Sequence, residues 1–433
     1  MQNKRLALIC QHFYPEMIST GMHMTELATG LSRQGWSLRV YCDQPVYRDE
    51  TQNEHAVPQR MEYEGIEIIR VPTLANPRGS LLERTINALT YLLMTAWCLF
   101  RDRRELRGVI NTTNPPFLGL AACCAKYVAK LSFVTIVYDV YPEVAICVGS
   151  VKKGSLIARV WQQVTRWIFN QSEGLIVIGR DMEQLVRQKL KEPDSSNVTL
   201  IPNWSDAERV YPVPRHENEF VREHTLSGRF VVQYSGRMGR THNLEPLLEA
   251  AQRLEGEPVL FQFIGDGAKR AKLEAMSQEM ALQNVQFLPY QPIEKLAHVL
   301  SAADLAVVCL ESACTGVSVP SKTYGIMASG RPILAFLEPS SEIGQVITER
   351  KCGLVLPAPT GEEVATLIRE LMAQPERLRA MGGNGYYAFR QEYTLARAVQ
   401  RYDAFLQKIF VYSEKKESLN VSWQKQAFKA EQR

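Results

Sequence analysis

Short runs of β-branched and aromatic residues alternate with helical patterns along most of the chain, and this alternation occurs twice. The first series begins at Arg5–Cys10 and ends near Ile201, and the second begins at Phe230–Tyr234. Strands that alternate with amphipathic helices form parallel βα units. We therefore predict the α/β class, with two similar Rossmann-like sheets that face each other across a cleft.

The segment Tyr211-Pro-Val-Pro-Arg215 separates the two series and has the composition of a linker. We predict an N-terminal domain over residues 1–210 and a C-terminal domain over residues 211–393. The last stretch, 413–433, is polar and has few apolar residues to anchor it, so we expect a tail.

The charge of the chain is nearly balanced, with 50 Lys and Arg against 46 Asp and Glu among 433 residues. This balance argues against duplex nucleic acid as the main partner and fits a small anion or an acidic membrane surface. The nine cysteines form no Cys-x-x-Cys motif. We predict buried free thiols in a reducing cytosol and, because no signal peptide is visible, a cytoplasmic protein.

The segment Ile86–Phe100 is apolar and is followed by the basic run Arg101–Arg107. It is shorter than the roughly 20 residues that a membrane span needs. We favour a buried or half-buried helix. The alternative is a helix whose outer face contacts lipid at the inner face of the plasma membrane.

Two loops in the first series follow strands and carry small or polar residues. In the first, Thr20 and Gly21 precede a helix, where backbone N–H groups can approach an anion or a sugar oxygen; a plain helix cap explains them equally well. In the second, Asp139 and Glu143 stand with two tyrosines at one strand end. Such groups suit sugar hydroxyls, although a turn with solvated acids is the alternative.

Two loops in the second series carry basic residues beside glycines or a helix start. Gly236 precedes Arg237, and Arg240 follows in the same loop, which suits phosphate oxygens. Ser321 and Lys322 begin a helix whose N–H groups could bind a diphosphate. We predict that Arg237 and Lys322 lie at neighbouring strand ends of one sheet, and that no metal is needed because no Asp-x-Asp pair is present.

A further tight turn contains Gly265 and Asp266, which could hold a ligand ring or only turn the chain.

Over about residues 5 to 410 the chain resembles the retaining, nucleotide-sugar-dependent glycosyltransferases of family 4, also called group 1, which have the GT-B fold. The closest branch resembles transferases of exopolysaccharide and O-antigen assembly, including colanic acid and N-acetylfucosaminyl transferases. The matching segments are Phe13-Tyr-Pro15 with Gly21, Asp139-Val-Tyr-Pro-Glu143, Ile201-Pro-Asn-Trp-Ser205, Tyr234-Ser-Gly-Arg237, Phe263-Ile-Gly-Asp-Gly267, Phe287-Leu-Pro-Tyr290, Ala303-Asp304, and Pro320-Ser-Lys322 with Met327-Ala-Ser-Gly-Arg-Pro332.

The chain departs from the family where most members carry Glu-x7-Glu. Val317 and Gly325 stand at the matching positions, and Glu311 lies upstream as a possible substitute. Tyr138 stands where many members have a histidine, and Arg240 and His242 lie where distant members have a lysine.

The resemblance implies transfer of a sugar, with retention, from a UDP- or GDP-linked donor to a glycan or lipid-linked acceptor, without another cofactor. It implies that the N-terminal domain binds the acceptor, that the C-terminal domain binds the donor, and that a helix over 394–412 returns to the N-terminal domain. Arg237, Lys322 and Asp139 would be catalytic. The other implied substrate contacts are Thr20, Gly21, Glu143, Asn203, Gly236, Arg240, Gly265, Asp266, Tyr290, Glu311 and Ser321.

Two other functions stay open from the sequence. One is a different enzyme of the same fold, such as a sugar-nucleotide epimerase or a phosphorylase. The other is a relative that binds nucleotide sugars without catalysis, which the missing Glu pair would favour and the intact Arg237 and Lys322 loops oppose.

Overall fold

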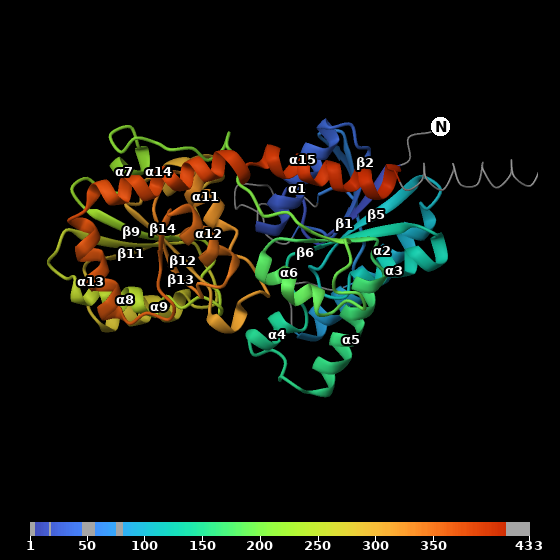
Figure 1. Ribbon diagram of the computed structural model, residues 1–433, viewed down its shortest axis with the longest axis horizontal. Coiled ribbons are helices and arrows are strands. Elements are labelled where there is room, and N and C mark those ends of the chain that lie inside the picture. The colour runs from blue at the N-terminus through green and yellow to red at the C-terminus, as the bar shows by residue number, and fades with distance from the viewer. Residues whose placement is uncertain (1–4, 17–18, 46–56, 75–80, 413–433) are drawn as a thin grey trace, which may run out of the picture.

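A computed structural model describes residues 5–16, 19–45, 57–74 and 81–412. It contains two sheets with helices on both faces, side by side in Figure 1. The predicted α/β class and the two Rossmann-like sheets are therefore confirmed. All strand pairs within both sheets are parallel except β3 with β4.

The N-terminal sheet has the order β3-β4-β2-β1-β5-β6-β7-β8. Its strands are β1 (Arg5–Ile9), β2 (Leu38–Cys42), β3 (Arg60–Tyr63), β4 (Ile66–Arg70), β5 (Leu106–Thr112), β6 (Ser132–Val137), β7 (Gly174–Val177) and β8 (Val198–Leu200). Its helices are α1 (Ser19–Arg33), α2 (Leu81–Arg101), α3 (Gly119–Ala129), α4 (Glu143–Cys147), α5 (Leu156–Gln171) and α6 (Arg180–Arg187).

The C-terminal sheet has the order β11-β10-β9-β12-β13-β14. Its strands are β9 (Phe230–Ser235), β10 (Val259–Ile264), β11 (Val285–Leu288), β12 (Leu305–Cys309), β13 (Ile333–Phe336) and β14 (Gly353–Val355). The helices around it are α7 (Glu219–Glu223), α8 (Glu245–Arg253), α9 (Arg270–Glu279), η1 (Ile293–Lys295), α10 (Leu296–Ser301), η2 (Ser312–Cys314), α11 (Lys322–Ala328), α12 (Glu342–Arg350) and α13 (Gly361–Met372).

Two last helices run along one side of both sheets (Figure 1). They are α14 (Pro375–Glu392), which packs against α11, and α15 (Leu395–Gln407), which packs against α1 and leads into the π-helical turn Lys408–Tyr412. One buried apolar cluster extends from the N-terminal sheet to these helices and to one face of the C-terminal sheet. A second cluster fills the other face, under α8 and α13.

The sequence patterns located most strands but missed two short ones at sheet edges. β3 reads Arg-Met-Glu-Tyr and has half of its residues exposed, so it lacks an apolar run. β14 has three residues and is paired only at the edge of its sheet. Neither segment is long or apolar enough to be recognised from composition.

The prediction that all cysteines are buried free thiols is wrong. Cys147 and Cys314 form a disulfide, and Cys124 is exposed. Cys147 and Cys314 are far apart in the sequence, so no spacing motif could have indicated the pair. The other free cysteines among the described residues are buried.

Two adjacent glycines in α14 provide a matched test of its packing. A Cβ on Gly382 would lie 2.2 Å from the backbone oxygen of Gly330, whereas a Cβ on Gly383 would meet nothing within 4 Å. We expect Gly382→Ala to lower the free energy of unfolding by about 1–3 kcal/mol through overpacking. Gly383→Ala should raise it by about 1 kcal/mol because alanine favours a helix. Urea denaturation measures the free energy of unfolding of both variants. Equal effects would contradict the packing of α14 on the backbone at Gly330.

Candidate functional site

Two glycine loops pack tightly against each other at the carboxyl ends of β9 and β10. Gly236 and Gly265 have φ values of 131° and 128°, which L side chains rarely adopt. A Cβ on Gly265 would lie 2.3 Å from the carbonyl oxygen of Gly236, and a Cβ on Gly267 would lie 2.4 Å from that of Met238. Because any side chain would collide here, the sequence must supply glycines at these positions.

Lys322 extends toward these loops from the start of α11. Its ammonium nitrogen lies 3.6 Å from the centre of the Tyr234 ring, and a Cβ on Gly236 would be 3.0 Å from it. The nitrogen is buried and has no hydrogen-bond partner among the described residues. Burial lowers the pKa of Lys322 to about 7. A buried cation without a carboxylate is costly, so this arrangement suits a group that an anionic ligand will neutralise.

Two strand ends bring this site together as the sequence predicts. β9, which precedes Gly236 and Arg237, is hydrogen-bonded to β12, whose following loop leads to Lys322. The prediction that Arg237 and Lys322 lie at neighbouring strand ends is therefore confirmed. Arg237 itself is exposed.

His242 fixes the shape of the Arg237 loop. Its Nδ1 accepts a hydrogen bond from the N–H of Gly239 at 2.9 Å, and the Tyr234 hydroxyl donates to the carbonyl oxygen of Arg237 at 2.6 Å. Burial, followed by the charge of Lys322, lowers the pKa of His242 to about 3. The imidazole is thus neutral at physiological pH. The sequence motif gave no sign of this supporting role.

Other predicted donor-side residues surround the glycine loops at different distances. A ring carbon of Tyr290 lies 3.2 Å from the position of a Cβ on Gly265. Arg240 and Asp266 are exposed, and the Asp266 carboxylate accepts a hydrogen bond from its own loop at the N–H of Gly267. Ser321 is partly buried and precedes Lys322. Glu311 lies 3.9 Å from Lys269.

Asp139 lies where the two halves of the molecule meet. It follows β6 and forms an isolated antiparallel bridge with Ser318, and the N–H of Val140 donates to the carbonyl oxygen of Val317 at 3.0 Å. Burial raises the pKa of Asp139 to about 6. A hydrogen bond with Ser318 stabilises the carboxylate and lowers the pKa, but by less than burial raises it. The fold therefore places Asp139 beside the loop that ends at Lys322.

The remaining predicted residues lie in the N-terminal half and are engaged locally. Glu143 forms an ion pair with Lys189. Thr20 and Gly21 are in the first turn of α1, where a Cβ on Gly21 would lie 2.6 Å from the carbonyl oxygen of Glu16. Asn203 is buried and its Oδ1 has no hydrogen-bond partner in the described parts of the chain. No hydrogen bond or ion pair joins these residues to Lys322.

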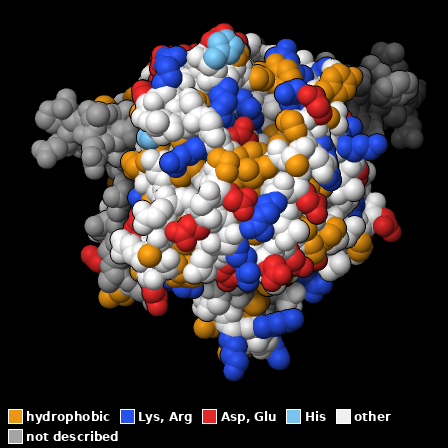
Figure 2. Space-filling view, turned by 90° about the vertical axis from the view of Figure 1, so that its left-hand side faces the viewer, with side chains coloured by type: hydrophobic (Ala, Val, Ile, Leu, Met, Phe, Trp, Pro, Cys, Tyr) orange, Lys and Arg blue, Asp and Glu red, His pale blue; other side chains and the backbone are white. Residues whose placement is uncertain are grey.

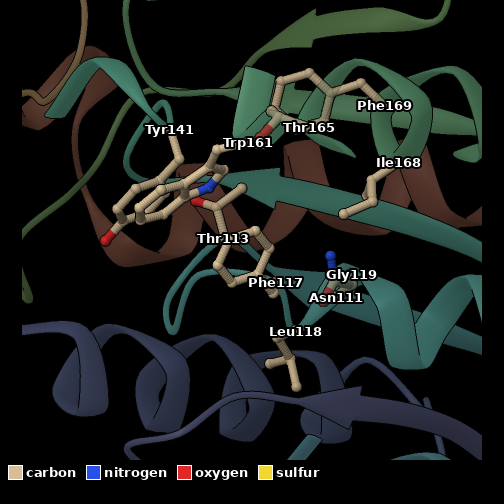
Figure 3. Close-up of a pocket in the computed structure, with 10 residues that line it drawn as sticks. All are labelled: Asn111, Thr113, Phe117, Leu118, Gly119, Tyr141, Trp161, Thr165, Ile168 and Phe169. Atoms are coloured by element: carbon tan, nitrogen blue, oxygen red, sulfur yellow. The ribbon is translucent and has the colours of Figure 1, made fainter. Parts of the chain in front are cut away.

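An aromatic pocket close to Asp139 was not predicted as a unit. The ring of Trp161 stacks with Phe117 at 4.7 Å and with Tyr141 at 5.3 Å between centroids. These rings line a pocket together with Asn111, which comes from the end of β5 (Figure 3). The Oδ1 atom of Asn111 is buried without a hydrogen-bond partner within the described ranges. Tyr141 was noted in its loop, but Trp161 lies in α5 and carries no motif.

Two family models match successive parts of the chain. Residues 20–204 match the glycosyl transferase 4-like domain, and residues 216–387 match the glycosyl transferases group 1 family.

Similar proteins are found among both sequences and solved structures. The probable glycosyltransferase WbjE of Pseudomonas aeruginosa is 32% identical over 303 residues, which cover 70% of this chain and 75% of WbjE. The putative colanic acid biosynthesis glycosyl transferase WcaI of Escherichia coli is 26% identical, covering 77% of this chain and 84% of WcaI. The structure of HepE from Anabaena in complex with UDP superposes with a TM-score of 0.69 at 12% identity, covering 93% of this chain and all of HepE.

The low pKa of Lys322 predicts a pH-dependent stability. Between about pH 7 and the ordinary lysine pKa of 10.5, the unfolded chain keeps the proton that the folded protein has lost. Unfolding therefore takes up a proton, and the free energy of unfolding rises with pH, by up to about 1.4 kcal/mol per pH unit. Lys322→Met should remove this rise. Urea denaturation at several pH values measures the difference between wild type and variant.

The exposed Lys191 provides a matched control, since Lys191→Met should keep the wild-type pH dependence. Parallel curves for wild type and Lys322→Met would show that the ammonium group keeps an ordinary pKa.

Proposed function

The chain belongs to the group 1 glycosyltransferases, and from this premise we propose that it transfers a sugar from a nucleoside diphosphate sugar to an acceptor in cell-surface polysaccharide biosynthesis. The single observation that supports the proposal most is the unpaired ammonium group of Lys322 beside the glycine loops. HepE, which has the same GT-B fold, binds UDP. We therefore assign a nucleoside diphosphate, UDP or GDP, to this position.

In the proposed reaction the bond between the anomeric carbon and the donor phosphate oxygen breaks. A bond to the acceptor hydroxyl forms on the same face of the sugar, and the hydroxyl proton passes to a donor phosphate oxygen. Negative charge develops on the leaving diphosphate, and Lys322 and Arg237 stabilise it. Because this charge also stabilises the protonated amine, donor binding raises the pKa of Lys322.

The acceptor in this proposal binds on the N-terminal side of the junction. Asp139 orients the acceptor hydroxyl, and with a pKa of about 6 it is mainly ionised at neutral pH. The stacked rings of Phe117, Trp161 and Tyr141 provide apolar faces next to it, and Asn111 adds an unpartnered acceptor oxygen. A pocket with aromatic walls and few polar groups is typical of small-molecule sites.

An exposed apolar face supports a peripheral membrane contact for a lipid-linked acceptor. Leu82, Ile86, Leu89, Leu93 and Trp97 are exposed and fall on one side of α2, whereas the opposite side is buried. In the described residues no helix has the length and apolarity to cross a bilayer.

Exposed apolar residues also occur on α5. α3 packs between α2 and α5, and α5 adds Leu156, Ile157 and Val160, exposed by 77%, 67% and 55%. The end of the molecule formed by the C-terminal half shows acidic, basic and hydrophobic side chains interspersed across its surface (Figure 2). α2 is half-buried, as the favoured sequence interpretation predicts, and its exposed apolar side also supports the lipid-contacting alternative.

We expect Arg237→Ala and Lys322→Ala each to lower turnover by about 100- to 1000-fold, as for the loss of one preorganised donor. Transfer from the preferred donor measures this, with melting temperature in parallel. Arg222→Ala, on the exposed side of α7, is the control and should change stability by less than about 0.5 kcal/mol and leave turnover unchanged. Near-normal turnover in both site variants would place the diphosphate elsewhere. Donor hydrolysis without transfer, or epimerised product, would identify a different enzyme class.

We expect the nucleoside diphosphate to bind without a metal ion. The described residues contain no group of three or more His, Cys, Asp or Glu side chains that could hold one. Calorimetry with UDP and GDP should give the same affinity with and without EDTA. Binding that requires a divalent cation would refute the metal-free site.

We expect the protein to float with anionic vesicles, more weakly at high salt because the contribution of basic residues is screened. Leu89→Glu with Leu93→Glu should abolish flotation, whereas Tyr387→Glu, at an exposed position in α14, should not. Flotation of the double variant at the wild-type level would exclude α2 as the contact.

A further inference from the structure

The disulfide between Cys147 and Cys314 joins the two halves of the molecule. Cys147 is the last residue of α4, in the N-terminal half, and Cys314 ends η2, between β12 and α11. Their Cα atoms are 5.6 Å apart, a separation usual for disulfides. This covalent bond therefore bridges the same junction at which Asp139 meets Ser318.

The other contacts described at this junction are non-covalent. The N–H of Val140 donates to Val317, and the N–H of Gly316 donates to the Asp181 carboxylate at 3.0 Å. Nearby, the guanidinium of Arg180 contacts Glu342 at 2.9 Å. Hydrogen bonds and partly exposed ion pairs of this kind contribute about 1 kcal/mol each and can open and re-form. The disulfide cannot open without a reductant.

The two bridged segments carry the candidate catalytic groups. Asp139 precedes α4 on the N-terminal side, and η2 leads through Val317 and Ser318 to Lys322 on the C-terminal side. Substrate entry and product release in two-part enzymes require such segments to separate and close again. A disulfide at this position fixes the distance between them.

We propose that Cys147 and Cys314 form a redox-sensitive latch that holds the two halves closed when oxidised and lets them open when reduced. Because the latch would regulate the proposed transferase site, this inference rests on the proposed function. The reduced protein turns over, whereas the oxidised protein is slow because substrates enter and products leave slowly.

Reduction proceeds by thiol–disulfide exchange. It begins at Cys147 because this sulfur is on a partly exposed residue, whereas Cys314 is only 1% exposed. The thiolate of a small thiol attacks the Cys147 sulfur and expels Cys314 as a thiolate, which takes up a proton. A second small thiol attacks the sulfur of the first small thiol in this mixed disulfide and releases Cys147 as a thiolate, which also takes up a proton. Two small thiols are oxidised to their disulfide, and the protein disulfide gains two electrons. A small disulfide, such as oxidised glutathione, reverses both steps.

The first test counts thiols in the full chain. One sample is reduced with dithiothreitol and another is treated with oxidised glutathione; both are then denatured, alkylated with a maleimide and weighed intact. Of nine cysteines, seven are free in the structure. The count uses Cys124→Ser, because the exposed Cys124 thiol would itself exchange with glutathione. In this variant we expect eight labels after reduction and six after oxidation, without added glutathione mass. Eight labels in both samples would overturn the proposal.

The second test compares turnover in the two states. Oxidation should lower turnover by about tenfold, within the range usual for coupling between sites, and dithiothreitol should restore it. Cys147→Ser and Cys314→Ser should have equal activity after either treatment. Cys124→Ser removes an exposed thiol and should keep the wild-type response. Equal turnover of oxidised and reduced wild type, or an unchanged response in both latch variants, would also overturn the proposal.

Hydrogen exchange separates the latch from the proposed function. Segments 139–147 and 312–320 should exchange more slowly in the oxidised wild type than in the reduced one. If the reduced protein binds no nucleoside diphosphate and transfers no sugar, the proposed function fails, and the exchange rates still decide whether the disulfide closes the junction. Equal exchange in both states would refute the latch.

Discussion

The ammonium group of Lys322 on the face of the Tyr234 ring is the contact on which the proposed donor side of the site depends. A cation over an aromatic ring gains about 2 kcal/mol or more when it is desolvated, which offsets only part of the cost of burial. The neighbouring Lys269 contacts Glu245 at 3.1 Å. The buried ammonium group of Lys322 has no hydrogen-bond partner among the described residues, and the neutral His242 adds no second charge beside it.

The space around Lys322 exists because the loops after β9 and β10 lack side chains. Gly236, Gly265 and Gly267 each sit where a Cβ would collide with a backbone or with Lys322. The same loop that supplies Lys322 also contacts Asp139 through Ser318, so one segment links the proposed donor and acceptor groups. In the proposed latch, this link lets a bond at Cys314 influence the reaction at Lys322.

The sequence predicted those residues of the candidate site whose position is set within a single strand–loop–helix unit, such as Arg237 after β9 and Lys322 at the start of α11. Apolar runs identified β9, β10 and β12, and the positions of glycine and basic residues after them indicated Arg237 and Lys322. It could not predict contacts set by packing between distant segments. The stacking of Trp161 from α5 on Tyr141, the support of the Arg237 loop by His242 and the pairing of Cys147 with Cys314 all depend on tertiary structure.

The most direct test of the central claim is a crystal structure of the protein with a bound nucleoside diphosphate. The account predicts a terminal phosphate oxygen within about 3 Å of Lys322 Nζ, the distance of a charge-assisted hydrogen bond, with the diphosphate against Gly236 and Gly265. A diphosphate bound elsewhere, with Lys322 still unpaired over Tyr234, would contradict it.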